Sequence, residues 1–399
     1  MAHAEATAQT VSANEHHAAA PVKASWRARW RAFRSRTIAR PGFQRWAAGF
    51  PLTRRIAQAN TRALFDLCAG FVYSQTLFAC IRLDLFHLLT DAPLTADAVA
   101  ARTGLGPAQA ERLLKAATAL DLLGRLPDGR FTLADLGAAL VGNPSVAAMI
   151  EHHALLYADL ADPVALLRGE AGATRLSRYW AYADAARGDP ANAAPVAAYG
   201  ALMGASQDLI ADDILEAYPL RGHRRLLDVG GGEGAFLKRA AAHAPDLRLM
   251  LFDLPAVAAR AAAGFTEAGL GTRAETFGGA FPDDPLPRGA DAVSLVRVVH
   301  DHDDDKVLAL LRAAHAALAP GGTLLIAEPM AGTPGAEAMA DAYFGFYLLA
   351  MGSGRCRTAM ELTHLLSKAG FGRIREIPTR RPFLVRLIAS NRLDGDACK

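Results

Sequence analysis

The sequence has few cysteines, and their spacing excludes the common metal sites. Cys68, Cys80, Cys356 and Cys398 form neither a CxxC pair nor a set with metal-ligand spacing. Reduced thiols in a cytoplasmic protein are therefore expected. Residues 1–20 lack the apolar core of a secretory signal, and charges interrupt the longest apolar stretches. We therefore expect neither a signal peptide nor a transmembrane helix.

Acidic residues are missing from one long N-terminal window. None lies between Glu15 and Asp66, whereas eleven lysine and arginine residues do. Because the net charge of the whole chain is only +3, the remainder is acidic overall. Trp26, Trp30 and Phe33 have the spacing that places side chains on one helix face. Three interpretations of residues 22–62 stay open: a disordered tail, a targeting segment, or an amphipathic helix that contacts the inner face of an anionic membrane.

The rest of the chain changes pattern twice. A capped helix, a turn, a second helix and a hairpin on Asp128-Gly129 follow the order of a winged helix. A helical stretch comes next. From Arg224, short apolar strands alternate with helices, which predicts a doubly wound α/β sheet. A last pair of strands at the C-terminus is expected to complete this sheet. The expected parts are a basic arm over 1–62, a winged-helix domain over 63–144, a helical layer over 145–220 that contributes to the substrate pocket, and an α/β domain over 221–399.

The strongest motif is a glycine-rich turn. Residues 226–234 read LLDVGGGEG, an apolar strand that enters a turn and then a helix. Glycines let a backbone approach a ligand closely, and the helix that follows offers free N–H groups. Asp253 stands nineteen residues past Gly234, at the end of the next strand. A carboxylate in that place can accept from both hydroxyls of a ribose, so the pattern predicts an adenosine cofactor.

Two adenosine cofactors fit this turn. Gly230, Gly232 and Ala235 also satisfy the loose dinucleotide pattern G-x-G-x-x-A, which keeps a nicotinamide cofactor as the alternative. S-adenosylmethionine is favoured because the motif lies mid-chain after a helical domain. It is also favoured by Asp228, two residues before the first glycine, and by the Pro-Gly-Gly of residues 320–322 before the fifth strand.

The second cluster, residues 300–305, reads HDHDDD and follows the fourth strand. It resembles the H-x-H-x-D-H metal pattern but has Asp305 in place of the last histidine, so no metal site is expected. The three aspartates, 303–305, read as a solvated helix start. His300 differs from them, because it stands at a strand end that faces the ligand crevice of an open α/β sheet. That is where a general base is needed.

With these motifs in order, residues 64–399 resemble the plant caffeate and acetylserotonin O-methyltransferases. The segments 279–287, 295–302 and 327–330 are most similar to those of the carotenoid O-methyltransferases of phototrophic bacteria, which methylate hydroxyneurosporene or demethylspheroidene. The resemblance implies a class I Rossmann-like methyltransferase domain with a seven-stranded, mostly parallel sheet, preceded by a winged-helix dimerisation domain. It also implies a homodimer, S-adenosylmethionine as methyl donor and direct transfer of the methyl group to a hydroxyl of a hydrophobic acceptor.

The resemblance also assigns roles to single residues. His300 is the expected base, Asp301 lies beside it, and Glu328 orients it. The helical segments supply candidates for an apolar acceptor pocket, with ordinary core packing as their alternative: Tyr157, Met203, Phe344, Tyr347 and Met351. The donor contacts are expected from Asp228, Gly230, Gly232, Asp253, Leu254, Gly279, Ala280, Phe281 and Arg297.

Three departures from the plant pattern weaken parts of this assignment. Ala280 replaces the carboxylate expected near the adenine, Val296 replaces a lysine four residues before the histidine, and Cys356 replaces a second supporting glutamate. Two alternative functions therefore stay open. One is methylation of a small phenolic or polyketide hydroxyl. The other is a winged-helix DNA-binding regulator, which the weakly basic helix expected over 108–123 disfavours, so no nucleic-acid partner is expected.

Overall fold

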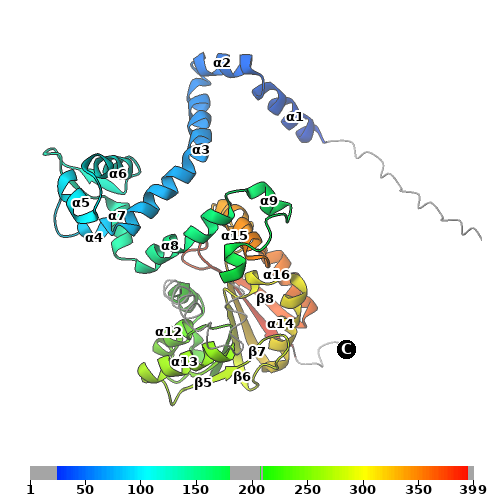
Figure 1. Ribbon diagram of the computed structural model, residues 1–399. Coiled ribbons are helices and arrows are strands. Elements are labelled where there is room, and N and C mark those ends of the chain that lie inside the picture. The colour runs from blue at the N-terminus through cyan, green and yellow to red at the C-terminus, as the bar shows by residue number, and fades with distance from the viewer. Residues whose placement is uncertain (1–24, 180–206, 208–209, 394–399) are drawn as a thin grey trace, which may run out of the picture. The chain divides into compact units, whose positions relative to one another are not determined.

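The computed structural model describes residues 25–179, 207 and 210–393 (Figure 1). The chain forms two compact units, Met1–Gln75 and Thr76–Lys399. Met203, one of the expected pocket residues, lies outside the described residues, as do residues 1–24.

The first unit consists of exposed helices: α1 (Trp26–Ile38), α2 (Pro41–Gly49) and most of α3 (Arg54–Arg82). The Ser25 hydroxyl caps α1 by accepting from the Ala28 amide, and no residue of α1 is buried. Apolar side chains of α3 are exposed as well. The exposed large apolar residues of α1 and α3 are Trp26, Trp30, Phe33, Ile38, Ile56, Leu64, Phe65, Leu67, Phe71 and Val72.

Helix α3 differs from the sequence expectation in two respects. The expected boundary at residue 62 falls inside it. By length and composition alone, α3 is also apolar enough to cross a membrane, contrary to the expectation that charges interrupt every such stretch. The physical reason is that all charges of α3 but that of Arg82 lie in its first half, with no charged residue between Asp66 and Arg82. The division of the chain into four parts stays a prediction.

The second unit begins with a small helical domain. The Thr95 hydroxyl accepts from the Ala98 amide and caps α5, as expected. The second helix ends at Ala119 because Leu123 already belongs to a strand. The helices and the hairpin enclose one buried apolar cluster, and the winged-helix classification itself stays a prediction. The elements are α4 (Leu85–Leu88), α5 (Ala96–Thr103), α6 (Pro107–Ala119), β1 (Leu123–Arg125), β2 (Phe131–Leu133) and α7 (Asp135–Val141).

A helical layer follows and packs with a later segment of the chain. Its helices α8 (Pro144–Asp159) and α9 (Pro163–Leu167) contact a π-helix, η4 (Ala338–Tyr343), and α15 (Phe344–Met351) through a shared apolar cluster. Segments almost two hundred residues apart in sequence thus build one wall. Residues of this wall line part of the cavity described below.

The seven-stranded sheet confirms the expected α/β fold. Its strand order is β5-β4-β3-β6-β7-β9-β8, and only β9 runs antiparallel to its neighbours. Apolar clusters cover both faces, one with α12 (Ala235–His243) and α13 (Pro255–Glu267), the other with α14 (Asp304–Ala317) and α16 (Ala359–Lys368) (Figure 1). The strands are β3 (Arg225–Val229), β4 (Arg248–Asp253), β5 (Ala274–Gly278), β6 (Ala290–Val296), β7 (Leu318–Glu328), β8 (Phe371–Ile377) and β9 (Arg386–Arg392).

Candidate active site

The glycine turn follows β3, at the carboxyl end of the sheet. Gly230 has a φ of +69°, and a Cβ there would lie 2.8 Å from the side chain of Val298, so neither the conformation nor the space suits another residue. Gly234 has a φ of +79° and precedes the first turn of α12. The turn thus exposes backbone to a cavity that Gly230 and Gly232 line.

Asp253 ends β4 and holds this turn in place. Its Oδ2 accepts from the Gly232 amide at 2.8 Å, and its Oδ1 accepts from the Leu254 amide at 2.7 Å. Burial raises the pKa of Asp253 to about 6, although the two backbone hydrogen bonds act in the opposite direction. Each oxygen keeps a further lone pair for a ligand hydroxyl. Asp253 and Leu254 both line the cavity, and their contact with a donor stays a prediction.

Asp228 lies beneath the turn rather than in the cavity wall. It is buried, and its Oδ1 accepts from the Ser294 hydroxyl at 2.6 Å. Burial raises the pKa of Asp228 to about 7. Among the described residues that line the cavity, Asp228 is not present, so a direct donor contact is not what this geometry offers. The sequence analysis missed Ser294, although a single hydroxyl in the otherwise apolar end of β6 was a signal for it.

His300 and Glu328 form the second half of the site. β6 is followed by a short 3₁₀ turn, η3 (Val299–Asp301), which carries His300, and Glu328 is the last residue of the neighbouring β7. His300 Nδ1 is hydrogen-bonded to Glu328 Oε2. The other carboxylate oxygen of Glu328, Oε1, accepts from the amides of Val298 and Val299 at 2.9 and 2.6 Å. Glu328 therefore fixes both the imidazole and the backbone before it.

The second nitrogen of His300 faces a carboxylate as well. Its Nε2 lies 3.2 Å from Oδ1 of Asp301. Burial is the largest single effect and lowers the pKa of His300, but Asp301 and Glu328 raise it, and the net direction is upward. Burial raises the pKa of Asp301 to about 6. Both His300 and Asp301 line the cavity, whereas Glu328 lies behind them.

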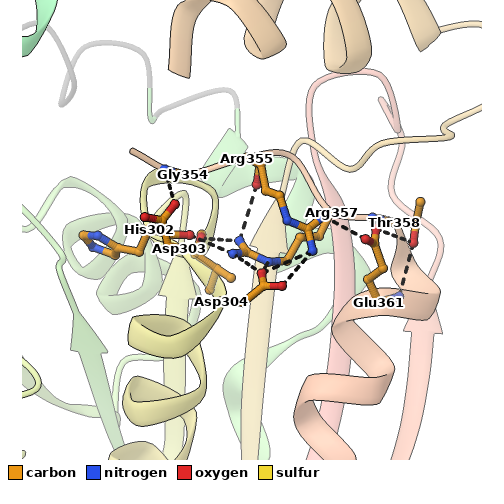
Figure 2. Close-up of polar contacts among 9 residues, drawn as sticks. His302, Asp303, Asp304, Gly354, Arg355, Arg357, Thr358 and Glu361 are labelled. Atoms are coloured by element: carbon orange, nitrogen blue, oxygen red, sulfur yellow. Dashed lines mark hydrogen bonds and ion pairs between the residues drawn. The ribbon is translucent and has the colours of Figure 1, made fainter. Parts of the chain in front are cut away.

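A buried arginine holds the segment that carries His300 (Figure 2). Arg357 donates to the carbonyl oxygens of Val299 and His302 at 2.8 and 2.7 Å, on either side of the histidine. Its Nε also donates to Asp304 at 2.8 Å, and Arg355 pairs with the same carboxylate at 3.0 Å. Asp304 begins α14 and its side chain is half exposed, as expected of a solvated acidic helix start, but the sequence analysis missed its two arginine partners.

The donor side continues along the loop after β5. Gly279, Ala280 and Phe281 line the cavity, as does Arg297. The Ala280 amide donates to Asp284 Oδ2 at 2.9 Å, so a nearby carboxylate orders the loop. His302 meets the ring of Phe281 edge-on with ring centroids 5.1 Å apart, and burial lowers the pKa of His302 to about 3. Within the described residues, no group of three or more His, Cys, Asp or Glu side chains could hold a metal ion.

One cavity of about 590 Å³ joins these parts. Phe344, Tyr347 and Met351, three of the expected substrate residues, line it, and their role toward an acceptor stays a prediction. Tyr157 is not among its described lining residues and instead packs edge-on against Phe78, with ring centroids 6.0 Å apart. The cavity is mostly apolar on this side, so it suits a hydrophobic acceptor.

The sequence analysis missed two histidines of α8. His152 Nε2 lies 2.9 Å from the hydroxyl of Tyr347, and His153 Nε2 lies 2.7 Å from that of Tyr343. Burial lowers the pKa of His152 to about 4 and also lowers that of His153. Nothing in the local sequence pairs these residues, because their tyrosine partners stand 195 and 190 positions later in the chain.

Comparison with known proteins identifies the family. Residues 157–372 match the O-methyltransferase domain, and residues 65–143 match the O-methyltransferase dimerisation domain. The demethylspheroidene O-methyltransferase of Cereibacter sphaeroides is 46% identical over 88% of this chain and 92% of that protein. The protein of that name in Rhodobacter capsulatus is 41% identical over 86% of this chain and 85% of that protein.

Solved structures share the fold. That of the mitomycin 7-O-methyltransferase has a TM-score of 0.72 and 25% identity, covering 85% of this chain and 99% of that one. Human N-acetylserotonin methyltransferase in complex with SAM has a TM-score of 0.65 and 24% identity, covering 84% and 98%.

These matches test several expectations. The dimerisation domain supports a homodimer, and neither the DNA-binding alternative nor a small phenolic acceptor is favoured by the relatives. The match to the O-methyltransferase domain includes the glycine turn, Asp253, His300 and Glu328. The chain belongs to the O-methyltransferase family and is, as expected, an S-adenosylmethionine-dependent O-methyltransferase.

Proposed function

We propose that this enzyme transfers the methyl group of S-adenosylmethionine to a hydroxyl of an acyclic carotenoid. One observation carries the proposal: a single, largely apolar cavity brings the glycine turn and Asp253 together with His300. The two relatives named for demethylspheroidene, 46% and 41% identical over most of the chain, support a carotenoid acceptor.

The residues on the donor side fit S-adenosylmethionine. Asp253 borders the cavity with lone pairs free for ribose hydroxyls, and Gly230 leaves room where a Cβ would collide with Val298. Gly232, Leu254 and the loop Gly279–Phe281 complete the proposed donor contacts, and Arg297 lies beside them. When bound, the donor supplies a methyl group that its sulfonium charge already activates. Asp228 supports the turn from below through Ser294.

His300 acts as the general base in this proposal. Glu328 accepts from Nδ1, which leaves the lone pair of Nε2 to take the proton of the acceptor hydroxyl. Asp301 stabilises the imidazolium that forms, because its carboxylate lies 3.2 Å from Nε2. A tertiary alcohol is a weaker acid than a phenol, so proton removal and methyl transfer occur together, and the fixed position of His300 matters more than its basicity alone.

The remaining proposals concern partners and location. We assign the homodimer contact to the domain over 63–144 and place the enzyme in the cytoplasm. The arm over 22–62 is proposed to touch an anionic membrane, where Trp26, Trp30 and Phe33 insert and the arginines meet the headgroups. An acceptor dissolved in the bilayer would be reached from that position.

A transfer assay tests the central proposal. The enzyme is incubated with labelled S-adenosylmethionine and a hydroxylated acyclic carotenoid in micelles, and the labelled lipid is identified. We expect the methyl ether of the carotenoid. His300→Ala should lower turnover about 10²–10⁴-fold without changing the affinity for S-adenosylhomocysteine. Labelling of phenols but not of the carotenoid would reject the proposed acceptor.

A further inference from the structure

Two tyrosine–histidine pairs interrupt the apolar wall of the cavity. His153 and Tyr343 form one, and His152 and Tyr347 form the other, with N···O distances of 2.7 and 2.9 Å. His153 and both tyrosines line the same cavity as His300. The two phenol rings are neighbours, with centroids 5.9 Å apart.

The pairs keep free hydrogen-bonding capacity. A tyrosine hydroxyl has one hydrogen and two lone pairs, so a single histidine partner leaves at least one site for a ligand. Burial lowers the pKa of both histidines and raises those of Tyr343 and Tyr347, so all four groups are neutral near pH 7. Neutral, fixed hydroxyls recognise an uncharged polar group rather than an ion.

The pairs stand close to the reacting groups. Tyr343 packs against Phe344 with centroids 5.0 Å apart, and Phe344 meets the His300 ring at 5.7 Å. After burial, the negative charge of Asp301 is among the influences that raise the pKa of Tyr347, so the two side chains lie near each other. Most of the described lining on this side is apolar, and Ser145 and Gln207 are further polar residues of it. The apolar lining residues are Val146, Met149, Ile150, Met339, Phe344 and Met351. Buried polar groups cost stability unless they are hydrogen-bonded, and here each tyrosine has a histidine partner.

We propose that the Tyr343–His153 and Tyr347–His152 pairs form a polar subsite that hydrogen-bonds the hydroxyl group of the acceptor and so selects the hydroxylated end of the chain. The proposal rests on the proposed function, since it assumes a hydroxylated carotenoid. The apolar skeleton gains affinity from the wall whichever end enters. The subsite adds affinity only when the end that enters carries the hydroxyl, which then lies within reach of His300.

The experiment compares two ligands in each variant. Dissociation constants are measured for a hydroxylated acyclic carotenoid and for the hydrocarbon of the same skeleton without the hydroxyl. The wild-type enzyme should prefer the hydroxylated ligand. Tyr343→Phe and Tyr347→Phe should each reduce that preference about two- to tenfold, the range for one net hydrogen bond. His153→Gln, which can still bond the phenol, should keep more of the preference than His153→Leu.

The chain offers a matched control. Tyr218 bonds His223 Nε2 at 3.0 Å in a pair of the same kind, and neither residue is among the described lining of the cavity. Tyr218→Phe should leave the preference unchanged, and all variants should bind S-adenosylhomocysteine normally. A preference equal to wild type in both cavity variants, or an equal loss for the two ligands, would show that the tyrosines only pack. A wild-type enzyme that binds the donor product but neither ligand rejects the proposed acceptor and the subsite together.

Discussion

His300 and Glu328 meet from the ends of two neighbouring parallel strands, and the carboxylate holds the imidazole by Nδ1 while its other oxygen takes two backbone amides. This arrangement fixes more than position. The amides of Val298 and Val299 need an acceptor, so one oxygen of the residue 328 side chain always faces them. The other terminal atom of that side chain then faces Nδ1 of His300 and decides whether Nδ1 carries a proton. The tautomer of the proposed base is thereby set by one side chain.

Glu328→Gln should therefore inactivate the enzyme while preserving the fold. The two amides hold the oxygen of the glutamine, so its NH₂ faces Nδ1 and forces the imidazole proton onto Nε2. A wrong tautomer of this kind costs about 10⁴-fold in kcat in a serine protease, and we expect a loss approaching that size. Turnover and S-adenosylhomocysteine affinity should be measured together. Glu267→Gln, an exposed change at the end of α13, is the control. Near-normal kcat in Glu328→Gln would contradict the role.

The pH dependence should move in a definite direction. A base works only when unprotonated, so kcat/KM should rise with pH through a pKa that lies above the ordinary histidine value. Asp301 raises the pKa of His300, while burial and Arg297 lower it. Asp301→Asn removes a raising influence, and the acidic limb of the profile should shift to lower pH. A shift to higher pH, or none, would mean that another group controls the limb.

Asp253→Ala should weaken donor binding by about 1.5–3 kcal/mol, the range for hydrogen bonds to a charged group. The carboxylate also holds the Gly232 amide, so part of the loss comes from the turn itself. Calorimetry with S-adenosylhomocysteine gives the value. Asp246→Ala, just before the other end of the same strand and exposed, should change nothing. Unaltered affinity in Asp253→Ala, or specific binding of NAD, would contradict the donor site.

The two arginines on Asp304 should differ sharply. The side chain of Arg357 is 1% exposed and donates to two carbonyls beside His300, whereas that of Arg355 is 44% exposed (Figure 2). Arg357→Ala leaves those carbonyls without this donor and should lower the free energy of unfolding by about 1–3 kcal/mol for each carbonyl left unpaired. Arg355→Ala should cost no more than about 1 kcal/mol. Denaturant titration of the two variants makes the comparison, and equal losses would contradict it.

The arm should bind anionic vesicles in a salt-dependent way. Each basic residue near such a surface contributes about 1 kcal/mol, and at physiological salt only those within about 8 Å count. The full chain should sediment with anionic vesicles at low salt and leave them at high salt. A chain that begins at Thr53, which keeps α3 intact, should stay in the supernatant. Retention on vesicles in high salt would instead indicate that α3 spans the bilayer.

Substitution of the aromatic residues refines this test. Trp26, Trp30 and Phe33 are all exposed, and their joint replacement by serine should weaken sedimentation although every arginine remains. Leu136→Ser, an exposed apolar change in another helix, should have no effect. Equal sedimentation of the aromatic variant and the wild type would leave charge as the only contribution of the arm.

Features that depend on neighbouring residues were predictable from the sequence. The glycine turn, Asp253 at the end of its strand and the seven strands follow from short patterns. His300 was placed by its strand end, and Glu328 by the family resemblance. Asp228 was assigned to the donor by the same proximity, but the pattern could not tell that its side chain turns to Ser294, beneath the turn.

Features that depend on distant residues were not predictable. Arg357 and Asp304 stand 53 positions apart, so the sequence placed the aspartate at an exposed helix start but did not reveal its arginine partners. The tyrosine–histidine pairs join α8 to residues near 345, and no periodicity reports such contacts. Tyr157 was expected in the cavity because it stands in the same helical segment, but its ring packs on Phe78. In α3 the long uncharged stretch between Asp66 and Arg82 was overlooked.

The wall that α8 shares with η4 and α15 separates two tasks of the enzyme. The strand ends carry the donor and the proposed base, whereas the helices shape the room for the acceptor. Substitutions on the helices can therefore change which molecule is methylated without disturbing the transfer chemistry. Such a division makes the acceptor range open to gradual evolution, and it tells an engineer to redesign α8 and residues 338–351 while leaving the sheet untouched.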